Sequence, residues 1–300
     1  MSGLTGANSP FAAMSKGVSL SQSIAFTVVY ALMGAALILR TVRGVTHKVA
    51  YICFTIFAVF RVVTFILRAV MSQTKPTSKH FLGVLMASGI VMVGGFLLLV
   101  EAVFFLNIDW HYAIRGRDRD ARRRNFMKIC HAIVVILTML GIVGAVLMLT
   151  SLTKNPPDMK QFQVSKDLRI ASGSLFLVFC VGVMVLPIVI SLQTPHHSRI
   201  RRFPITVLLV VFGAALVLEC IYRIYSAVKT DGFVMTQAGL DVFLVLPEWL
   251  ILFPSIILHF DSMGEMGFWK GQRGGPVAAV DRAGEAGFSG VETRDSSKTG

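Results

Sequence analysis

Residues 233–260 form a long apolar run that contains two carboxylates, Asp241 and Glu248. A helix of this length would measure about 42 Å, more than the roughly 30 Å of hydrocarbon in a bilayer. Acids inside a membrane are costly, and they pair with other groups or face a water-filled cavity. We therefore expect a transmembrane helix, kinked at Pro247 and Pro254, whose two acids find partners elsewhere in the chain.

The composition agrees with a membrane protein. Of the 300 residues, 54% are hydrophobic and 15% are charged, a balance that is unusual for a soluble domain. The 29 Lys and Arg exceed the 16 Asp and Glu. Basic residues beside apolar spans are typical of membrane topology, so we expect no nucleic-acid partner.

Six further apolar runs lie before residues 233–260 in the sequence. Together the seven runs predict an all-α membrane protein built as a seven-transmembrane helix bundle. The six runs cover residues 20–39, 49–71, 80–106, 127–150, 169–192 and 203–228. We expect a short disordered N-terminus over residues 1–19, a membrane domain over residues 20–260 and a disordered cytosolic tail over residues 261–300. We also expect the first span to be kept as a signal anchor.

The distribution of Lys and Arg predicts the orientation. With Lys128 and Arg169, which lie at span ends, counted with the adjoining loops, eighteen lie in the tail and in the loops after the first, third and fifth spans, and eight lie on the opposite side. The other three, Arg61, Arg68 and Arg223, lie inside spans. Because basic residues concentrate in the cytosol, the amino end is predicted outside or in a lumen and the tail in the cytosol. The sequence leaves open whether the membrane is the plasma membrane or an endomembrane.

Six charged residues form a candidate intramembrane polar site between the second, sixth and seventh spans. They are Arg61, Arg68, Glu219, Arg223, Asp241 and Glu248. We expect Arg61 or Arg68 to pair with Asp241, and Glu219 with Arg223 four residues later. Two interpretations remain open: a polar cavity open to the outer half of the membrane, or a closed ion-pair network that fixes helix register.

The loop after the third span is rich in arginine and has two interpretations as well. It is either a solvated determinant of topology or a surface for anionic lipid. Its arginines are Arg115, Arg117, Arg119, Arg122, Arg123 and Arg124. His196 and His197 are adjacent and lack the i, i+4 spacing of a helical metal site, so we expect no metal, no cofactor and no catalytic residues.

Two known groups of seven-span proteins offer comparisons. Receptors coupled to G proteins share the architecture, but the third span ends in Asn107-Ile108-Asp109-Trp110 without an Asp-Arg-Tyr motif. Ile221-Tyr222-Arg223 and Glu248-Trp249 resemble motifs of the fungal lipid-translocating exporter family, over about 40 residues. Glu219 and Ser226 depart from that family's pattern, which has Arg and Glu at these two positions.

The resemblance implies that the chain translocates or otherwise handles a lipid or amphiphile, with membrane lipids and an amphiphilic small molecule as partners. A fungal seven-span family of another activity fits as well. Two alternatives from other classes stay open: a receptor-like signalling protein with an unspecified cytosolic partner, and a membrane scaffold whose ion pairs are structural.

Overall fold

The computed structural model describes residues 19–42, 47–75, 78–115, 121–153, 158–193, 196–228 and 237–258. The predicted disordered N-terminus and tail lie outside these residues, except for Ser19. Six helices in the described part are long and apolar enough to cross a membrane. The chain is therefore a helical bundle of the membrane-embedded type.

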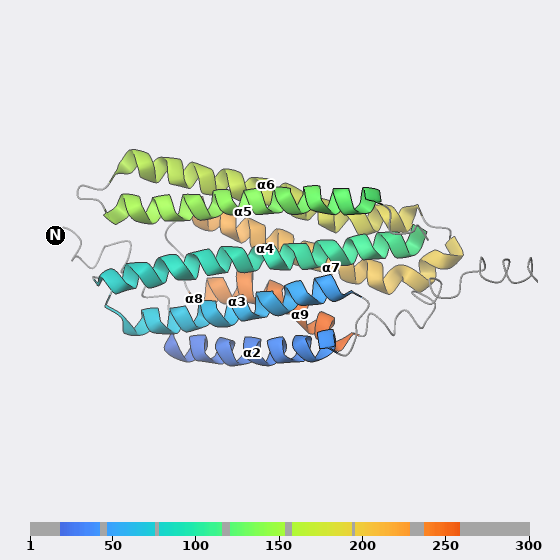
Figure 1. Ribbon diagram of the computed structural model, residues 1–300, viewed down its shortest axis with the longest axis horizontal. Helices are drawn as coiled ribbons and strands as arrows, with labels where there is room; N and C mark the ends of the chain where they lie inside the picture. The colour runs from blue at the N-terminus through green and yellow to red at the C-terminus, as the bar shows by residue number, and fades with distance from the viewer. Residues whose placement is uncertain are drawn as a thin grey trace, which may run out of the picture.

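The six long helices run along the long axis of the molecule and are joined by short connections, so neighbours in sequence are antiparallel (Figure 1). They are α2 (Leu20–Val42), α3 (Lys48–Gln73), α4 (Lys79–Arg115), α5 (Ala121–Thr153), α6 (Met159–Leu192) and α7 (His196–Val228). Each packs on the next one along the chain. A last helical segment, over residues 237–257, packs on both α7 and α2 and closes the ring.

Several helices extend beyond the apolar runs that predicted them. The expected loop at residues 107–126 is largely helical, since α4 continues to Arg115 and α5 begins at Ala121. Arg, Lys and Gln are good helix formers, so a helix need not end where its apolar run ends. Trp110, just beyond the third apolar run, is only 2% exposed and belongs to the core. Pro204, near the start of the sixth apolar run, lies well inside α7.

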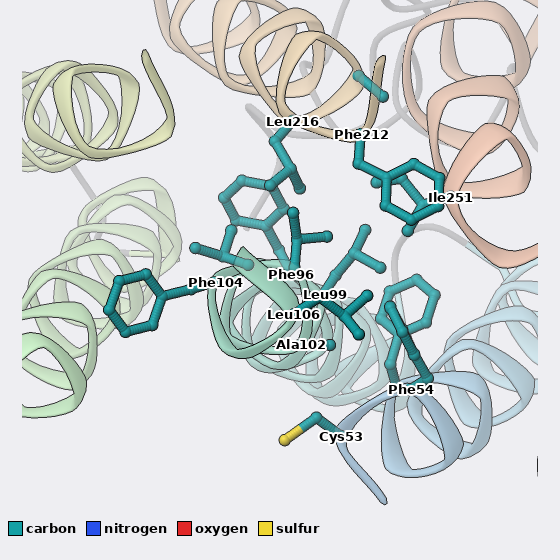
Figure 2. Close-up of a cluster of buried hydrophobic side chains, with 14 of the residues drawn as sticks. Cys53, Phe54, Phe96, Leu99, Ala102, Phe104, Leu106, Phe212, Leu216 and Ile251 are labelled. Atoms are coloured by element: carbon teal, nitrogen blue, oxygen red, sulfur yellow. The ribbon is translucent and has the colours of Figure 1, made fainter. Parts of the chain in front are cut away.

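The core gathers around α4, which contacts α3, α5, α6 and α7 (Figure 2). Its side chains Phe96, Leu99 and Leu106 are buried, as are Phe212 of α7 and Ile251 of the last segment, and residues 99–110 are buried except for two half-buried positions, Phe105 and Asp109. A helix that is apolar all round belongs in the interior of a bundle. The outer helices keep large apolar side chains on their surfaces, as lipid contact requires.

The last segment is not the single kinked helix that we expected. Its described part consists of α8 (Gln237–Leu240), the π-helical turn η2 (Asp241–Val245) and α9 (Leu246–Ile257). Pro247 has no N–H to donate to the carbonyl four residues earlier, and its ring clashes there in a regular helix. A π-turn immediately before the proline accommodates both effects, with the Leu246 N–H bonded to the Asp241 carbonyl.

Arg40, at the end of α2, holds the end of α9. Its Nη1 donates to the backbone carbonyls of Ser255 and Leu258, each at 2.7 Å. The Tyr51 hydroxyl donates to the same Ser255 carbonyl at 3.1 Å. The last carbonyls of a helix have no intrahelical partner, and a cation there also complements the helix dipole. α2 and α9 therefore run parallel and end at the same end of the bundle.

Candidate functional site

A chain of charged side chains from α3, α7 and α9 crosses the interior of the bundle. Arg61 Nη2 contacts Glu248 Oε1, and the other carboxylate oxygen of Glu248 accepts a hydrogen bond from the Tyr30 hydroxyl of α2. Arg61 Nη2 also lies 3.6 Å from Glu219 Oε1. Tyr30, Arg61, Glu219 and Glu248 are each 0% exposed. Charges buried this deeply require such partners, because each ion alone loses its hydration.

Arg223 extends this chain by one turn of α7. Its Nη2 and Nε donate to Glu219 Oε1 at 2.6 and 3.2 Å, so one carboxylate oxygen serves two arginines. The Arg223 guanidinium also lies over the ring of Phe96, with its carbon 4.4 Å from the ring centroid. We refer to Tyr30, Arg61, Glu219, Arg223 and Glu248 as the ion-pair network. Arg223 is its only member with an exposed side chain, at 19%.

The ion-pair network is not fully saturated by protein groups. Among the described residues, nothing accepts a hydrogen bond from Nε or Nη1 of Arg61, and nothing donates one to Oε2 of Glu219. The Arg61 guanidinium instead lies 5.0 Å from the centroid of the Phe57 ring. An aromatic face attracts a cation and compensates part of the lost hydrogen bonding.

Arg68 and Asp241 form a second charged group next to the ion-pair network. Arg68 lies two turns beyond Arg61 on α3, and it is close enough to Asp241 and Tyr222 to interact electrostatically with both. All three side chains are half-buried. The opposite charges of Arg68 and Asp241 balance each other, so this group adds no net charge to the interior.

Arg223 also lines a cavity of about 310 Å³, which lies between α4, α5, α6, α7 and the start of the last segment. Its wall is mainly apolar, with Met92, Phe96 and Phe176 among the lining residues. At 1.5 Å per residue, the lining residues lie about 15 to 26 Å from the starts of α4 and α6 and about 3 to 18 Å from the ends of α5 and α7. In the predicted orientation, these helix ends lie toward the outer side of the membrane.

Arg169 of α6 enters the same cavity. Its Nη1 lies 2.9 Å from the sulfur of Met148, a thioether that accepts hydrogen bonds only weakly. No carboxylate of the described residues forms an ion pair with it. Its stem crosses α5 at Gly144, where an added Cβ would lie 2.8 Å from Arg169 Cγ. A larger residue at this crossing would force the arginine stem to shift.

The second, sixth and seventh apolar runs converge as expected, because Arg61 contacts both Glu219 and Glu248. The expected Glu219–Arg223 pair is also confirmed. We expected Arg61 or Arg68 to pair with Asp241. Arg68 is the arginine close enough to Asp241 to interact with it, whereas Arg61 contacts Glu248. Counted at 1.5 Å per residue in straight helices, Glu248 would lie about 7 Å deeper than Arg61. The reach of the arginine side chain and the extra residue of the π-turn close that gap.

Three contributors were missed in the sequence. Tyr30 was one polar hydroxyl in an apolar run, Arg40 was counted as a loop charge, and Arg169 was placed at the start of a span. Because α6 begins at Met159, Arg169 lies about 15 Å along the helix. Its distance from the helix end was the missing signal, and it required the true helix boundary.

Two other features of the sequence concern residues near the opposite end of the bundle. Glu101, an acid near the end of the third apolar run, contacts Nδ1 of His131 on α5. The side chains at positions 112–124 lie outside the described part of the structure, so the lipid surface proposed for that loop stays a prediction. Among the described residues, no three His, Cys, Asp or Glu side chains come together as a metal site.

Comparison with known proteins adds no relative. No protein-family model matches the chain, and searches of curated proteins and of solved structures find no match either. The functional argument therefore depends on the geometry of the ion-pair network and the cavity.

Proposed function

We propose that this polytopic membrane protein handles a lipid or another amphiphile, which binds in the cavity between α4, α5, α6 and α7. The observation that supports this is a cavity of ligand size with an apolar wall and two guanidinium groups. Small-molecule sites are typically concave, mostly apolar and furnished with a few convergent polar groups. An amphiphile matches both parts of such a wall, and the resemblance of Ile221-Tyr222-Arg223 to exporter motifs implies the same class of ligand.

The fully buried side chains limit how translocation would proceed. The ion-pair network is closed off from the surface at Arg61, Glu219 and Glu248, which are fully buried. An amphiphile in the cavity therefore cannot pass through the network in this state. Translocation therefore requires a second state in which these contacts open. We propose that the cavity is the loading site and that the network separates it from the inner half of the membrane.

Reception is the second candidate, and one observation favours it. The contacts run without interruption from Arg223 at the cavity, through Glu219 and Arg61, to Glu248 on α9. The far end of α9 is held by Arg40 at the predicted cytosolic end. A bound amphiphile that moves Arg223 would thus act on a helix that reaches the cytosol. If nothing binds, a scaffold with purely structural ion pairs is the remaining candidate.

The proposal includes a seventh crossing and an orientation. Residues 237–257 run beside α7 and α2 and would measure about 31 Å as a continuous helix, which matches the hydrocarbon thickness. We expect Leu4→Cys to react with a membrane-impermeant thiol reagent on intact cells, and Gly290→Cys to react only after permeabilisation. The four native cysteines are buried and provide a low background. The reverse labelling pattern would overturn the orientation.

A reconstitution experiment separates the candidates. The purified chain is placed in vesicles that contain a lipid with a fluorescent, chemically quenchable label, and quenching from outside reports movement between leaflets. Protein-dependent movement that Gly89→Leu abolishes supports translocation, because Gly89 lines the cavity and has open space around its Cα. Binding without movement supports reception. The absence of both would overturn the proposal in favour of a scaffold.

A matched control exists for that variant. Gly182 also has nothing within 4 Å of an added Cβ, but it lies on the exposed surface of α6 and does not line the cavity. Gly182→Leu adds the same apolar volume outside the cavity, so movement of the labelled lipid is expected to stay at the level of the unmodified chain.

A further inference from the structure

The charges around the cavity do not balance among the described residues. Three arginines (Arg61, Arg169 and Arg223) face two glutamates (Glu219 and Glu248), while Arg68 and Asp241 compensate each other. One positive charge is left over. The uncompensated cation is Arg169, whose only described polar contact is the sulfur of Met148.

The guanidinium groups of Arg169 and Arg223 both line the cavity, and no carboxylate of the described residues forms an ion pair with Arg169. Arg169 is close enough to Arg223 for the two cations to repel. The carboxylate of Glu219 serves Nε and Nη2 of Arg223, and no described residue accepts a hydrogen bond from its Nη1. Two guanidinium groups that line one largely apolar cavity are suited to binding a carboxylate or a phosphate.

The two serine hydroxyls of the cavity do not compete for this role. Ser172 donates to the backbone carbonyl of Leu137 at 2.7 Å, and Ser226 donates to that of Arg223 at 2.9 Å. The two guanidinium groups are therefore the charged donors in the cavity wall, which also includes the hydroxyl-bearing Tyr222. Met92, Val93 and Phe176 surround the remaining volume and supply a surface for the first part of a hydrocarbon chain.

The geometry points to Arg169 and Arg223 as an anion subsite that recognises the anionic headgroup of an amphiphile, a carboxylate or a phosphate monoester, with its chain along the apolar wall. This inference depends on the proposed amphiphile binding and adds its headgroup class. A negative charge on the ligand would compensate Arg169 and relieve the repulsion between the two arginines. The volume of about 310 Å³ suits a headgroup with a short stretch of chain rather than a complete phospholipid.

The test is equilibrium binding to the full chain in neutral detergent. The probe is a radiolabelled sixteen-carbon fatty acid, and the competitors are the matching alcohol, lysophosphatidic acid and lysophosphatidylcholine. We expect the fatty acid and lysophosphatidic acid to compete at least about tenfold better than the other two, the factor that corresponds to one charge-assisted hydrogen bond. Equal competition by the alcohol would overturn the anion subsite.

Variants assign the preference to Arg169. Arg169→Met is expected to weaken fatty-acid binding by about tenfold or more and to leave binding of the alcohol unchanged, whereas Arg169→Lys keeps part of the preference. Gly89→Leu should weaken binding of both probes, and Gly182→Leu neither. Arg169 has no acidic partner among the described residues, so its loss is not expected to unfold the bundle. If Arg169→Met weakens binding of the fatty acid and of the alcohol equally, the proposed anion subsite is wrong.

The outcomes separate this inference from the proposed function. Binding of fatty acid and alcohol alike, abolished by Gly89→Leu, would retain amphiphile binding and overturn the anion subsite. Displacement of the fatty acid by millimolar acetate or inorganic phosphate would confirm the anion subsite but assign it to a free anion, against the amphiphile. A complete lack of binding by any probe would overturn both.

Discussion

Arg61 and Arg169 both lie within apolar helices, but their surroundings differ in almost every respect. Arg61 is 0% exposed, contacts Glu248 and lies 3.6 Å from Glu219. Arg169 is half-buried, faces a cavity and meets only a thioether among the described polar groups. One arginine is neutralised by the fold itself, and the other remains available for an external anion. The difference separates a charge that holds helices together from one that is suited to recognition.

Arg223 connects the two environments. It shares the Glu219 carboxylate with Arg61 and lines the cavity together with Arg169. A change of contacts on its cavity side therefore reaches the buried side through one carboxylate oxygen. The comparison makes opposite predictions for substitutions that look alike in sequence, and four experiments test it.

The largest effect is expected for Arg61→Met. The substitution leaves Glu248 buried without its cation, and breaking a buried pair in this way costs about 3 to 5 kcal/mol. We expect a large fall in the thermal unfolding midpoint of the detergent-purified protein, measured by its intrinsic tryptophan fluorescence. Arg61→Met combined with Glu248→Gln removes both charges, while Arg223 still compensates Glu219. A double variant no more stable than Arg61→Met would contradict the pairing.

Tyr30→Phe tests the end of the ion-pair network that lies farthest from the cavity. The change removes one hydrogen bond to the Glu248 carboxylate, and such bonds to charged groups contribute about 1.5 to 3 kcal/mol. The same thermal assay should show a moderate loss of stability. Binding of the fatty-acid probe at the cavity should stay unchanged, because Arg223 and Arg169 keep their positions. If Tyr30→Phe weakens fatty-acid binding by more, in free energy, than it lowers stability, the two environments are not independent.

Gly144→Ala tests the position of Arg169. The added methyl group would lie 2.8 Å from Arg169 Cγ and 3.2 Å from the Ser165 carbonyl oxygen, so the arginine stem must shift. Overpacking of this size costs about 1 kcal/mol, since a flexible side chain yields before the backbone does. Binding of the anionic probe should weaken while binding of the matching alcohol changes little. Gly182→Ala, at a site with open space around it, is the control.

The smallest change in stability is expected for Arg169→Met. The variant removes a cation that has no acidic partner among the described residues, so it relieves a desolvation cost rather than breaking a pair. We expect a thermal midpoint that is unchanged or higher than that of the unmodified chain, opposite in sign to Arg61→Met. A loss comparable to that of Arg61→Met would show that Arg169 is structural, and the contrast between the two arginines would fail.

The bundle and the identity of its buried charges followed from the sequence. A run of about 20 apolar residues must be helical in a bilayer, because only an internally bonded backbone avoids unsatisfied polar groups there. Carboxylates inside such runs must find cations, so Glu219 and Glu248 were predicted to meet arginines from other helices. The i, i+4 relation of Glu219 and Arg223 is a local property of one helix. These inferences depend on neighbours in sequence and on the solvent alone.

The choice of partners and the existence of a cavity were decided by tertiary structure. Arg61 contacts Glu248 rather than Asp241 because a π-turn before Pro247 and the packing of α9 between α2 and α7 set the register of that segment. Arg169 enters a cavity because Gly144 lets its stem pass between α5 and α6. Contacts between helices depend on rotations and shifts of a few ångströms that apolar patterns do not specify, since all sides of a membrane helix are apolar. The sequence therefore determined which charges must be compensated, and only the packing decided which of them are compensated within the fold.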